Sequence, residues 1–282
     1  MSAYRFCRSD DIALLVDALN RCWAPYYPDE PPMTPAGFKR WIRDLQVWCS
    51  SCMVAFSGSH PIGVLIGAKR PSGTLVHKIA VHPDHRRQGH GRHLLASLGS
   101  KLAILGPRRM IAEVPETLAP ACGLFTASGY VQEALLTDYV LHPEKDPREA
   151  GHDGRFVIPV TVDDLAANGL LGEADPQVCW ERAVETLTAR KDDIAGLAVA
   201  SDERIEAYVL YVQGGEIVSL RSLVQDGGAR LAQLLVHLRG QGVAASRIPK
   251  VHSAEFSREL LEKLVIRPAG GHLLYAANAR SG

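Results

Sequence analysis

The stretch that decides the fold is His77-Lys-Ile-Ala-Val81-His-Pro-Asp-His-Arg86-Arg-Gln-Gly89-His-Gly91-Arg-His-Leu-Leu95. Its pattern predicts a short strand over Ile79 to Val81, a basic turn over Arg86 to Gly91 and a helix that begins near Arg92. Glycines let the backbone of such a turn approach a ligand closely and adopt dihedral angles that other residues avoid. The helix that follows directs unpaired N–H groups and the positive end of its dipole at the same point. The stretch therefore predicts an anion site that suits a pyrophosphate.

Two familiar phosphate motifs do not fit this turn. The mononucleotide P-loop needs Lys-Ser/Thr after its last glycine, and the dinucleotide fingerprint needs a third glycine where this chain has Leu94. What remains is Arg86-x-x-Gly89-x-Gly91 between an apolar strand and a leucine-rich helix. This pattern resembles the acetyl-CoA signature of the GCN5-related N-acetyltransferases, the GNAT family. The alternative is a solvated basic loop that caps an ordinary helix.

The resemblance implies a role for each residue of the stretch. The backbone of Ile79, Ala80 and Val81 is expected beside the pantetheine arm of acetyl-CoA, and the Val81 N–H is expected to polarise the acetyl oxygen. Acetyl-CoA is then the co-substrate, and no metal is expected. The pyrophosphate is expected on the turn and the start of the helix, at Arg86, Arg87, Gln88, Gly89, His90, Gly91 and Arg92.

Acetyl transfer to an amine also needs a base that removes the ammonium proton. His77 is one candidate, because it shares strand parity with Ile79 and Val81 and histidine titrates near neutral pH. Glu113, at the end of a strand predicted over residues 110–114, is the second. The alternatives are a half-exposed strand histidine and a surface carboxylate, neither with a chemical role.

The acid that would protonate the departing CoA thiolate is missing from the pattern. Relatives commonly carry a tyrosine in the segment that reads Ala121-Cys-Gly-Leu-Phe125 here, so Phe125 occupies the tyrosine position. Phenylalanine can pack against pantetheine but cannot donate a proton, and the usual upstream asparagine falls near Thr117. A CoA thiol is acidic enough to leave as the thiolate, so the substitution does not abolish the reaction.

The acceptor amine is not specified by the sequence. Trp23, Tyr26 and Tyr27, with Asp29 and Glu30, lie between the first two predicted helices, where the resemblance places acceptor-binding residues. They predict either an aromatic, acidic lining for a cation or a proline-stiffened loop that covers the core.

The chain resembles two copies of one α/β (α+β) plan, each a mixed, mostly antiparallel sheet flanked by helices. We expect a GNAT domain over residues 1–143, a polar linker over 144–154 and a second GNAT-like domain over 155–282. The second half has only Gln-Asp-Gly-Gly-Ala between Val224 and Arg230, without paired arginines, which predicts a degenerate copy. The alternative is a second acetyl-CoA site that uses Gly227 and Gly228.

Composition excludes several other classes. The 282 residues carry 31 basic and 31 acidic side chains, so a general nucleic-acid or membrane-surface binder is not indicated. No apolar run approaches the ~20 residues that cross a bilayer, and a cytoplasmic location is expected. Cys49 and Cys52 lack a second pair to complete a zinc site, and the dense histidines near the turn follow no single helical face, so we expect packed thiols and solvated histidines.

The resemblance therefore predicts an N-acetyltransferase that moves the acetyl group of acetyl-CoA to a primary amine of a small molecule, or of a peptide or protein, by direct attack in a ternary complex. A monomer or homodimer is expected, with no nucleic-acid or membrane partner. The alternative, prompted by Phe125 and the altered second half, is a non-catalytic acyl-CoA-binding or regulatory module.

Overall fold

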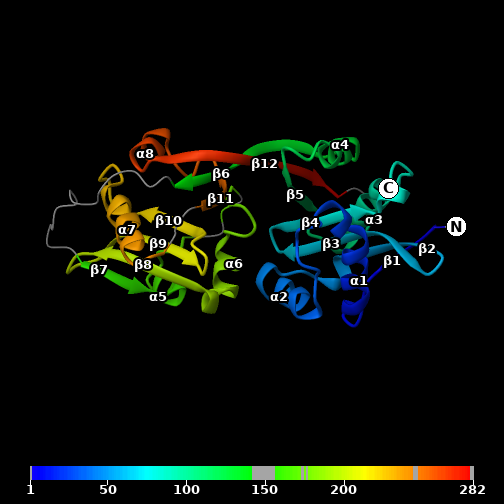
Figure 1. The fold of residues 1–282 in the computed structure, drawn as a ribbon, viewed down its shortest axis with the longest axis horizontal. Coiled ribbons are helices and arrows are strands. Elements are labelled where there is room, and N and C mark those ends of the chain that lie inside the picture. Colours follow the sequence, from blue (N-terminus) through cyan, green and yellow to red (C-terminus); the bar gives the residue numbers. More distant parts are fainter. Residues whose placement is uncertain (1, 142–155, 173–174, 176, 244–246, 280–282) are drawn as a thin grey trace. The chain divides into compact units, whose positions relative to one another are not determined.

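The computed structural model describes residues 2–141, 156–172, 175, 177–243 and 247–279 (Figure 1). The chain divides into unit 1, Met1–Ala134 with Leu273–Gly282, and unit 2, Leu135–His272. This division differs from the one expected from the sequence, because the segment from Leu273 onward is grouped with the first unit. The linker expected over residues 144–154 lies outside the described residues.

Unit 1 holds most of the elements that the first half of the sequence predicts. Its elements in chain order are β1 (Ser2–Phe6), α1 (Ile12–Cys22), the 3-10 helix η1 (Ala24–Tyr26), α2 (Pro35–Leu45), the 3-10 helix η2 (Cys49–Ser51), β2 (Met53–Ser57), β3 (His60–Arg70), β4 (Gly73–Val81), the 3-10 helix η3 (Pro83–His85), α3 (His90–Leu105), β5 (Arg109–Pro115) and α4 (Ala119–Ala127). Strand β6 (Val131–Leu141) begins in unit 1, and β12 (Ile266–Asn278) ends there.

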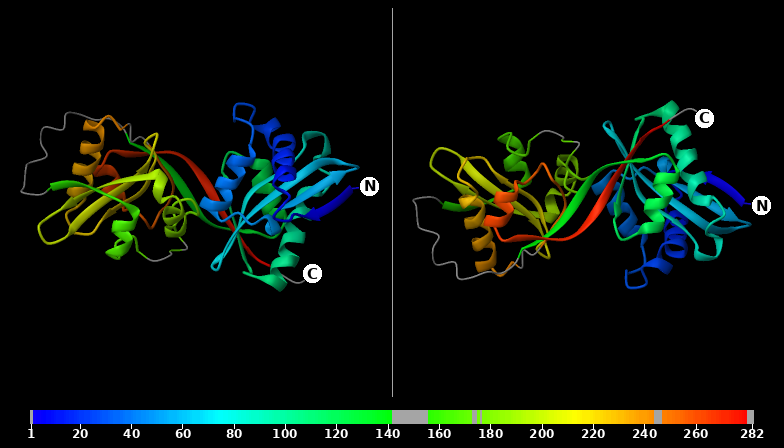
Figure 2. Two further views of the ribbon diagram at one scale, coloured as in Figure 1. Left: turned by 90° about the horizontal axis from the view of Figure 1, so that it is seen from below. Right: turned by 90° about the horizontal axis from the view of Figure 1, so that it is seen from above.

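The strands of unit 1 form one sheet in the order β1-β2-β3-β4-β5-β12-β6. The pairs from β1 to β4 are antiparallel, whereas β4 and β5 are parallel. Helices α1 and α2 lie on one face of this sheet, and α3 and α4 lie on the other (Figure 2). The leucines of α3 pack with Val76, Met110 and Tyr275 in one buried cluster on the second face. The mixed α/β class predicted from the sequence is confirmed.

Local signals explain where the helices begin. Thr34 caps α2, because its hydroxyl accepts a hydrogen bond from the Gly37 N–H at 3.0 Å. Asp11 stands at the N-cap position of α1, but its carboxylate does not cap the helix. It accepts hydrogen bonds from the Arg8 N–H and the Arg5 guanidinium instead. Helix α3 starts at His90, two residues before the predicted start.

A β-bulge interrupts the pairing of β3 with β4. Ile66 lies opposite Lys78, but Gly67 lies opposite Val76, so His77 is the extra residue. The bulge changes which side chains share a face, because the alternation restarts after it. The expectation that His77 shares a face with Ile79 is therefore wrong. The His77 ring packs on Trp41 of α2, whereas Ile79 packs with the buried cluster on the α3 face.

Strands β4 and β5 pair over a short length only. Their register comprises Thr74 with Met110 and Leu75 with Ile111, although β4 continues to Val81 and β5 to Pro115. The two strands therefore part after Leu75, and the backbone edges that face each other beyond this point are not joined by strand pairing. This opening lies directly before the basic turn.

Unit 2 repeats this order of elements. After its part of β6 come β7 (Phe156–Val160), α5 (Val162–Ala167), α6 (Val184–Ala189), the 3-10 helix η5 (Lys191–Asp193), β8 (Ile194–Ala200), β9 (Ile205–Val212), β10 (Ile217–Ser222), α7 (Ala229–Gly240), β11 (Arg247–His252) and α8 (Arg258–Lys263), followed by the start of β12. Strands β10-β9-β8-β7 form an antiparallel sheet, and β11 pairs with β6.

The repetition is clearest around the two glycine turns. The hairpin β8–β9, the unit β10–turn–α7 and the sequence β11–α8–β12 correspond to β2–β3, β4–turn–α3 and β5–α4–β6. A parallel bridge joins Glu216 to Arg247 at the start of β10 and β11, as Thr74 and Met110 join β4 and β5. The element order therefore supports two copies of one plan.

Candidate functional site

Unit 1 contains a cavity of about 830 Å³ at the point where β4 and β5 part. Side chains from both faces of the sheet line it: η1 and Trp23 on the α1 side, and the starts of α3 and α4 on the other. A ligand in this cavity can therefore pass between the two strands and reach both faces.

Most of the predicted cofactor residues lie in this cavity. The lining includes Ile79, Ala80, Val81, Arg86, Arg87, Gly89, His90, Gly91, Arg92 and Phe125. Gln88 and Thr117, which the resemblance also named, are not among its lining residues. All three predicted acceptor residues, Trp23, Tyr26 and Tyr27, line it, as do His77 and Glu113.

The two glycines of the turn have different functions. Gly89 has a φ of +85° and stands at the N-cap of α3, and a Cβ atom there would meet nothing within 4 Å. It is required for its backbone conformation. Gly91 lies inside the helix, where a Cβ atom would approach Leu124 of α4 to 3.1 Å. Gly91 thus permits close packing of two helices, and only Gly89 supplies the unusual dihedral angle expected of both.

The first turn of α3 presents the features of an anion site. The opening N–H groups of a helix have no acceptor within the helix, and those of α3 begin at the cavity wall. Arg86, Arg87 and Arg92 add positive charge to the same wall. Arg87 has a φ of +62°, a left-handed conformation that costs a non-glycine residue about 1 kcal/mol. Three arginines and a helix N-terminus therefore line the same cavity.

His90, the first residue of α3, is buried and is held by a hydrogen bond from β1. Its Nδ1 lies 2.6 Å from the Tyr4 hydroxyl. Burial, with the neighbouring His85 and His93, lowers the pKa of His90. Its imidazole is thus kept neutral next to the turn, which lets it pack under the helix N-terminus without a charge.

The backbone of β4 offers two N–H groups to the opening between the strands. The His82 N–H donates to the Ile62 carbonyl of β3 at 2.9 Å. Because successive N–H groups point to alternate neighbours, those of Ile79 and Val81 point to the side of β5. Val81 is thus placed as the resemblance implied, but the Ile79 N–H has the same orientation. Either can donate to an acyl oxygen in the opening.

Tyr26 covers the end of β4. Its hydroxyl donates to the Val81 carbonyl oxygen at 2.6 Å, and the Arg86 guanidinium lies 5.4 Å from the centre of its ring. Burial raises the pKa of Tyr26, although Arg86 opposes this shift, so the phenol remains a proton donor at neutral pH. Tyr26 therefore ties η1 to the strand that carries the two N–H groups.

Trp23 and Tyr27 form an aromatic pair beside Tyr26. Their rings stack with centroids 4.6 Å apart, and the Trp23 indole N–H donates to Glu30 at 3.0 Å. The Lys78 ammonium lies 4.0 Å from the centre of the indole ring. Sequence analysis did not name Lys78, which lies on the face opposite Ile79; the bulge adds His77 to the same face.

Phe125 lines the cavity from α4 and belongs to the buried core. Its ring stacks on Tyr275 at 5.8 Å and contacts Tyr130 edge-on at 5.1 Å. The Tyr130 hydroxyl lies 3.9 Å from the Met110 sulfur, within the core cluster. The position that carries a tyrosine in relatives is thus an apolar wall here.

Comparison with known proteins agrees with this geometry. Residues 12–130 match the acetyltransferase (GNAT) family. They form a GNAT acetyltransferase domain. The whole chain is similar in fold to a tandem GNAT protein from the clavulanic acid biosynthesis pathway, at 16% identity with a TM-score of 0.66 and full coverage of both chains.

Two further solved structures show the same fold. A GCN5-related N-acetyltransferase from Sphaerobacter thermophilus matches at 15% identity and a TM-score of 0.67, covering 100% of this chain and 96% of that one. A putative acetyltransferase from Pyrococcus horikoshii matches at 15% identity and a TM-score of 0.60, covering 99% and 90%. No curated protein matches the sequence. Family and fold together identify acetyl transfer as the chemistry of the GNAT domain.

In unit 2 the turn before α7 corresponds to the turn before α3, and a carboxylate of the protein binds its N–H groups. Gly228, at the N-cap of α7, has a φ of +86°, close to that of Gly89 in the GNAT domain. The Asp226 carboxylate accepts hydrogen bonds from the Gly228 and Arg230 N–H groups, both at 2.8 Å. Partial burial acts to raise the pKa of Asp226, but these hydrogen bonds outweigh it and the pKa lies below its usual range. The helix N-terminus is therefore already neutralised within the chain.

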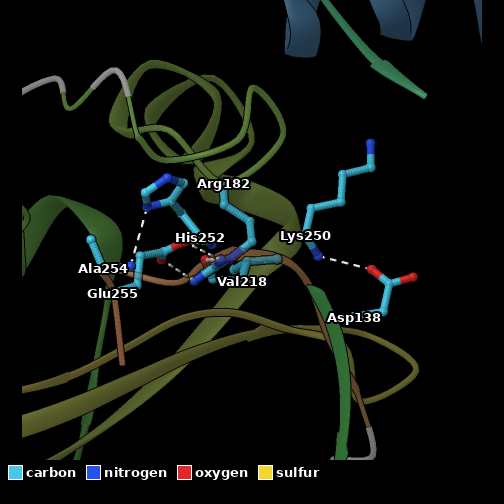
Figure 3. Close-up of polar contacts among 7 residues, drawn as sticks. All are labelled: Asp138, Arg182, Val218, Lys250, His252, Ala254 and Glu255. Atoms are coloured by element: carbon cyan, nitrogen blue, oxygen red, sulfur yellow. Dashed lines mark hydrogen bonds and ion pairs between the residues drawn. The ribbon is translucent and has the colours of Figure 1, made fainter. Parts of the chain in front are cut away.

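The opening beside β10 is also filled by side chains (Figure 3). Arg182, itself buried, donates to both carboxylate oxygens of Glu255 at 3.1 and 2.8 Å and to the Val218 carbonyl at 3.3 Å. A cavity of about 200 Å³ remains there, roughly a quarter of the volume in the GNAT domain. Leu260 of α8 would lie 2.3 Å from a Cβ atom at Gly228, so it covers the turn.

The cysteines and histidines do not form a metal centre among the described residues. No group of three or more His, Cys, Asp or Glu side chains there is arranged to hold an ion. All six cysteines are free thiols, and burial raises the pKa of Cys7 and Cys22 to about 12. Within the described part of the chain, no helix combines the length and apolar character needed to span a membrane.

Proposed function

We propose that this protein transfers the acetyl group of acetyl-CoA to a primary amine of a small molecule, by direct attack in a ternary complex in the GNAT domain. The observation that carries the proposal is the single cavity that reaches both faces of the sheet where β4 and β5 part. One side holds the cationic turn, and the other holds the aromatic residues of η1. A thioester and an amine can therefore meet between the strands.

The cofactor side suits acetyl-CoA. The pyrophosphate would lie on the opening N–H groups of α3, with Arg86, Arg87 and Arg92 supplying charge. Space for it exists above Gly89, where a Cβ atom would meet nothing. The pantetheine arm would follow β4 towards Phe125, whose apolar ring suits it. Acetyl-CoA supplies the activated acetyl group.

The acceptor side would supply the nucleophile. The amine nitrogen attacks the thioester carbon, the C–N bond forms, the C–S bond breaks and CoA leaves as the thiolate. The N–H groups of Ile79 and Val81 would stabilise the oxyanion. His77, at the bulge between the strands, would accept the ammonium proton, and Glu113 is the second candidate for that step. The thiolate would take its proton from solvent, because Phe125 cannot donate one.

We further propose that unit 2 is a copy of the GNAT fold that has lost its cofactor site, which leaves one site per chain. Asp226, Leu260 and the Arg182–Glu255 pair support this proposal, since they take the places of a pyrophosphate and its cavity. The second site considered at Gly227 and Gly228 would need the N–H groups that Asp226 already binds. A monomer or homodimer in the cytoplasm fits a protein that uses acetyl-CoA and keeps six free thiols.

The test is CoA thiol release from acetyl-CoA with a panel of small primary amines, for the wild type and for His77→Gln and Glu113→Gln. We expect His77→Gln to lower kcat by about 100-fold with little change in acetyl-CoA affinity, since a general base contributes on the order of 10²-fold or more. The acidic limb of the pH–rate profile should disappear with it. His60→Gln, an exposed histidine at the start of β3, is the matched control.

Two other outcomes separate the alternatives. If the acidic limb of the pH–rate profile disappears in Glu113→Gln while the kcat of His77→Gln stays near the wild-type value, Glu113 would be the base. Firm acetyl-CoA binding without turnover of any small, peptide or protein amine would overturn the transferase proposal and favour a non-catalytic acyl-CoA-binding module.

A further inference from the structure

We propose that Tyr26 occupies part of the acetyl-CoA path in the free protein, and that acetyl-CoA binds by displacing the Tyr26 hydroxyl from the Val81 carbonyl. The inference rests on the proposed function, because it concerns the cofactor path in the same cavity. It follows from two contacts of Tyr26, one with the edge of β4 and one with Arg86.

The Val81 carbonyl points into the opening between β4 and β5. Val81 lies opposite Gly63 of β3. The next N–H along β4, that of His82, donates to the Ile62 carbonyl. Both backbone groups of Val81 therefore point away from β3, towards the side of β5. The pairing of β4 with β5 ends at Leu75, so this pairing does not reach the Val81 carbonyl.

The Tyr26 hydroxyl stands on this open edge of β4. It donates to the Val81 carbonyl at 2.6 Å, and both residues line the cavity. In the proposed function the pantetheine arm follows the same strand, and its amide groups can pair with an open strand edge as a further strand would. The phenol and the pantetheine arm therefore need the same place beside Val81.

The second contact of Tyr26 is also made to a group that acetyl-CoA would use. The Arg86 guanidinium lies 5.4 Å from the centre of the Tyr26 ring, within the range of a cation–π contact. The proposed function assigns Arg86 to the pyrophosphate, and a guanidinium binds a phosphate more strongly than it binds an aromatic ring. Binding of the cofactor would thus weaken both contacts that hold Tyr26 over the end of β4.

Displacement of Tyr26 would change the acceptor side of the cavity. Tyr26 ends η1, and Trp23 and Tyr27 stand directly before and after this helix. The Tyr26 N–H donates to the Trp23 carbonyl at 2.9 Å, and the rings of Trp23 and Tyr27 stack with centroids 4.6 Å apart. The predicted acceptor residues are therefore joined to the residue that the cofactor displaces. Cofactor binding is in this way coupled to the shape of the acceptor side.

The experiment measures the binding of CoA, because CoA follows the cofactor path without turnover. Calorimetry gives the affinity, and stopped-flow tryptophan fluorescence gives the association rate. Tyr26→Phe keeps the ring beside Arg86 and removes the hydroxyl. Tyr27→Phe is the matched control, because Tyr27 lines the same cavity while its ring stacks on Trp23. Trp23→Phe shows how much of the fluorescence change comes from Trp23.

We expect Tyr26→Phe to bind CoA about fivefold more tightly than the wild type and to associate faster, because one hydrogen bond no longer has to be broken. Tyr27→Phe should bind CoA as the wild type does. The fluorescence change that CoA causes in the wild type should be largely lost in Trp23→Phe.

Unchanged or weaker CoA binding by Tyr26→Phe would overturn the inference while leaving the cofactor site intact. A fluorescence change that persists in full in Trp23→Phe would contradict the coupling to the acceptor side. If neither the wild type nor any variant binds CoA, the proposed function fails and the inference fails with it.

Discussion

The turns before α3 and α7 have similar N-cap geometry and different surroundings. Gly89 and Gly228 both stand at a helix N-cap with φ near +85°. In unit 1 the N–H groups of the helix begin at the wall of a large cavity with three arginines. In unit 2 the Asp226 carboxylate accepts two of them. A helix N-terminus favours an anion. In unit 2 this anion is part of the protein, and in unit 1 the function proposed above assigns the same place to a ligand.

The largest effect is expected from placing a carboxylate in the turn of unit 1. Gly89→Glu should lower acetyl-CoA affinity by at least about a thousandfold, roughly 4 kcal/mol, because it repels phosphate and strains the turn. Equilibrium binding measures this. Gly58→Glu is the control: Gly58 also has a positive φ and an open Cβ position, but lies in the β2–β3 hairpin. Equal losses in the two variants would show that the turn before α3 is not the cofactor site.

A smaller effect is expected from opening the filled cavity of unit 2. Arg182→Met leaves Glu255 without its buried partner and should lower the free energy of unfolding by about 3 kcal/mol, measured in urea. Acetyl-CoA affinity should not change. The double variant Arg182→Met/Glu255→Met should recover most of the loss, whereas Lys191→Met, in an exposed ion pair with Asp163, should have no measurable effect. A drop in acetyl-CoA affinity in Arg182→Met would contradict the assignment of one site to unit 1.

The smallest effect is expected from replacing the Asp226 carboxylate in the turn before α7. Asp226→Asn should lower stability by about 1 kcal/mol at pH 7, because an amide oxygen replaces two charge-assisted acceptors. The folded pKa of Asp226 is below its unfolded value, so its stabilisation is present above the unfolded pKa of about 3.9 and is lost as pH falls through the folded value. The gap between variant and wild type should therefore close below about pH 4.

Urea unfolding at several pH values tests this, with the exposed Asp202→Asn as control. Acetyl-CoA stoichiometry should stay at one per chain in every variant. A gap that does not narrow as the pH falls below about 4, or a second acetyl-CoA bound to the wild type, would contradict the proposal for unit 2.

Local patterns predicted the parts of the site that depend on neighbouring residues. The strand, the basic turn and the helix around Gly89 follow from a run of apolar residues, two glycines and the leucine spacing of α3. The GNAT fold and the repeated order of elements could be predicted because they also depend on local sequence patterns.

Contacts between distant residues explain what was missed. The bulge at His77 depends on the register of β4 against β3, which no local pattern fixes, so the face on which His77 lies could not be derived. The packing of Gly91 against Leu124 depends on how α4 meets α3. The contact of Asp226 with the start of α7 could have been predicted, because this aspartate stands only two residues before the N-cap glycine Gly228.

The path of β12 has a consequence for how the protein is made. This strand lies between β5 and β6 in the sheet, yet it is the last strand of the chain. Its Tyr275 stacks on Phe125, which lines the cavity. The ribosome synthesises β1 to β5 well before β12, so the sheet of unit 1 lacks an internal strand until residues 266–278 have emerged. The sheet that carries the candidate site is thus complete only after β12 has been made, and a fragment cut after residue 143 would lack a strand from the middle of this sheet.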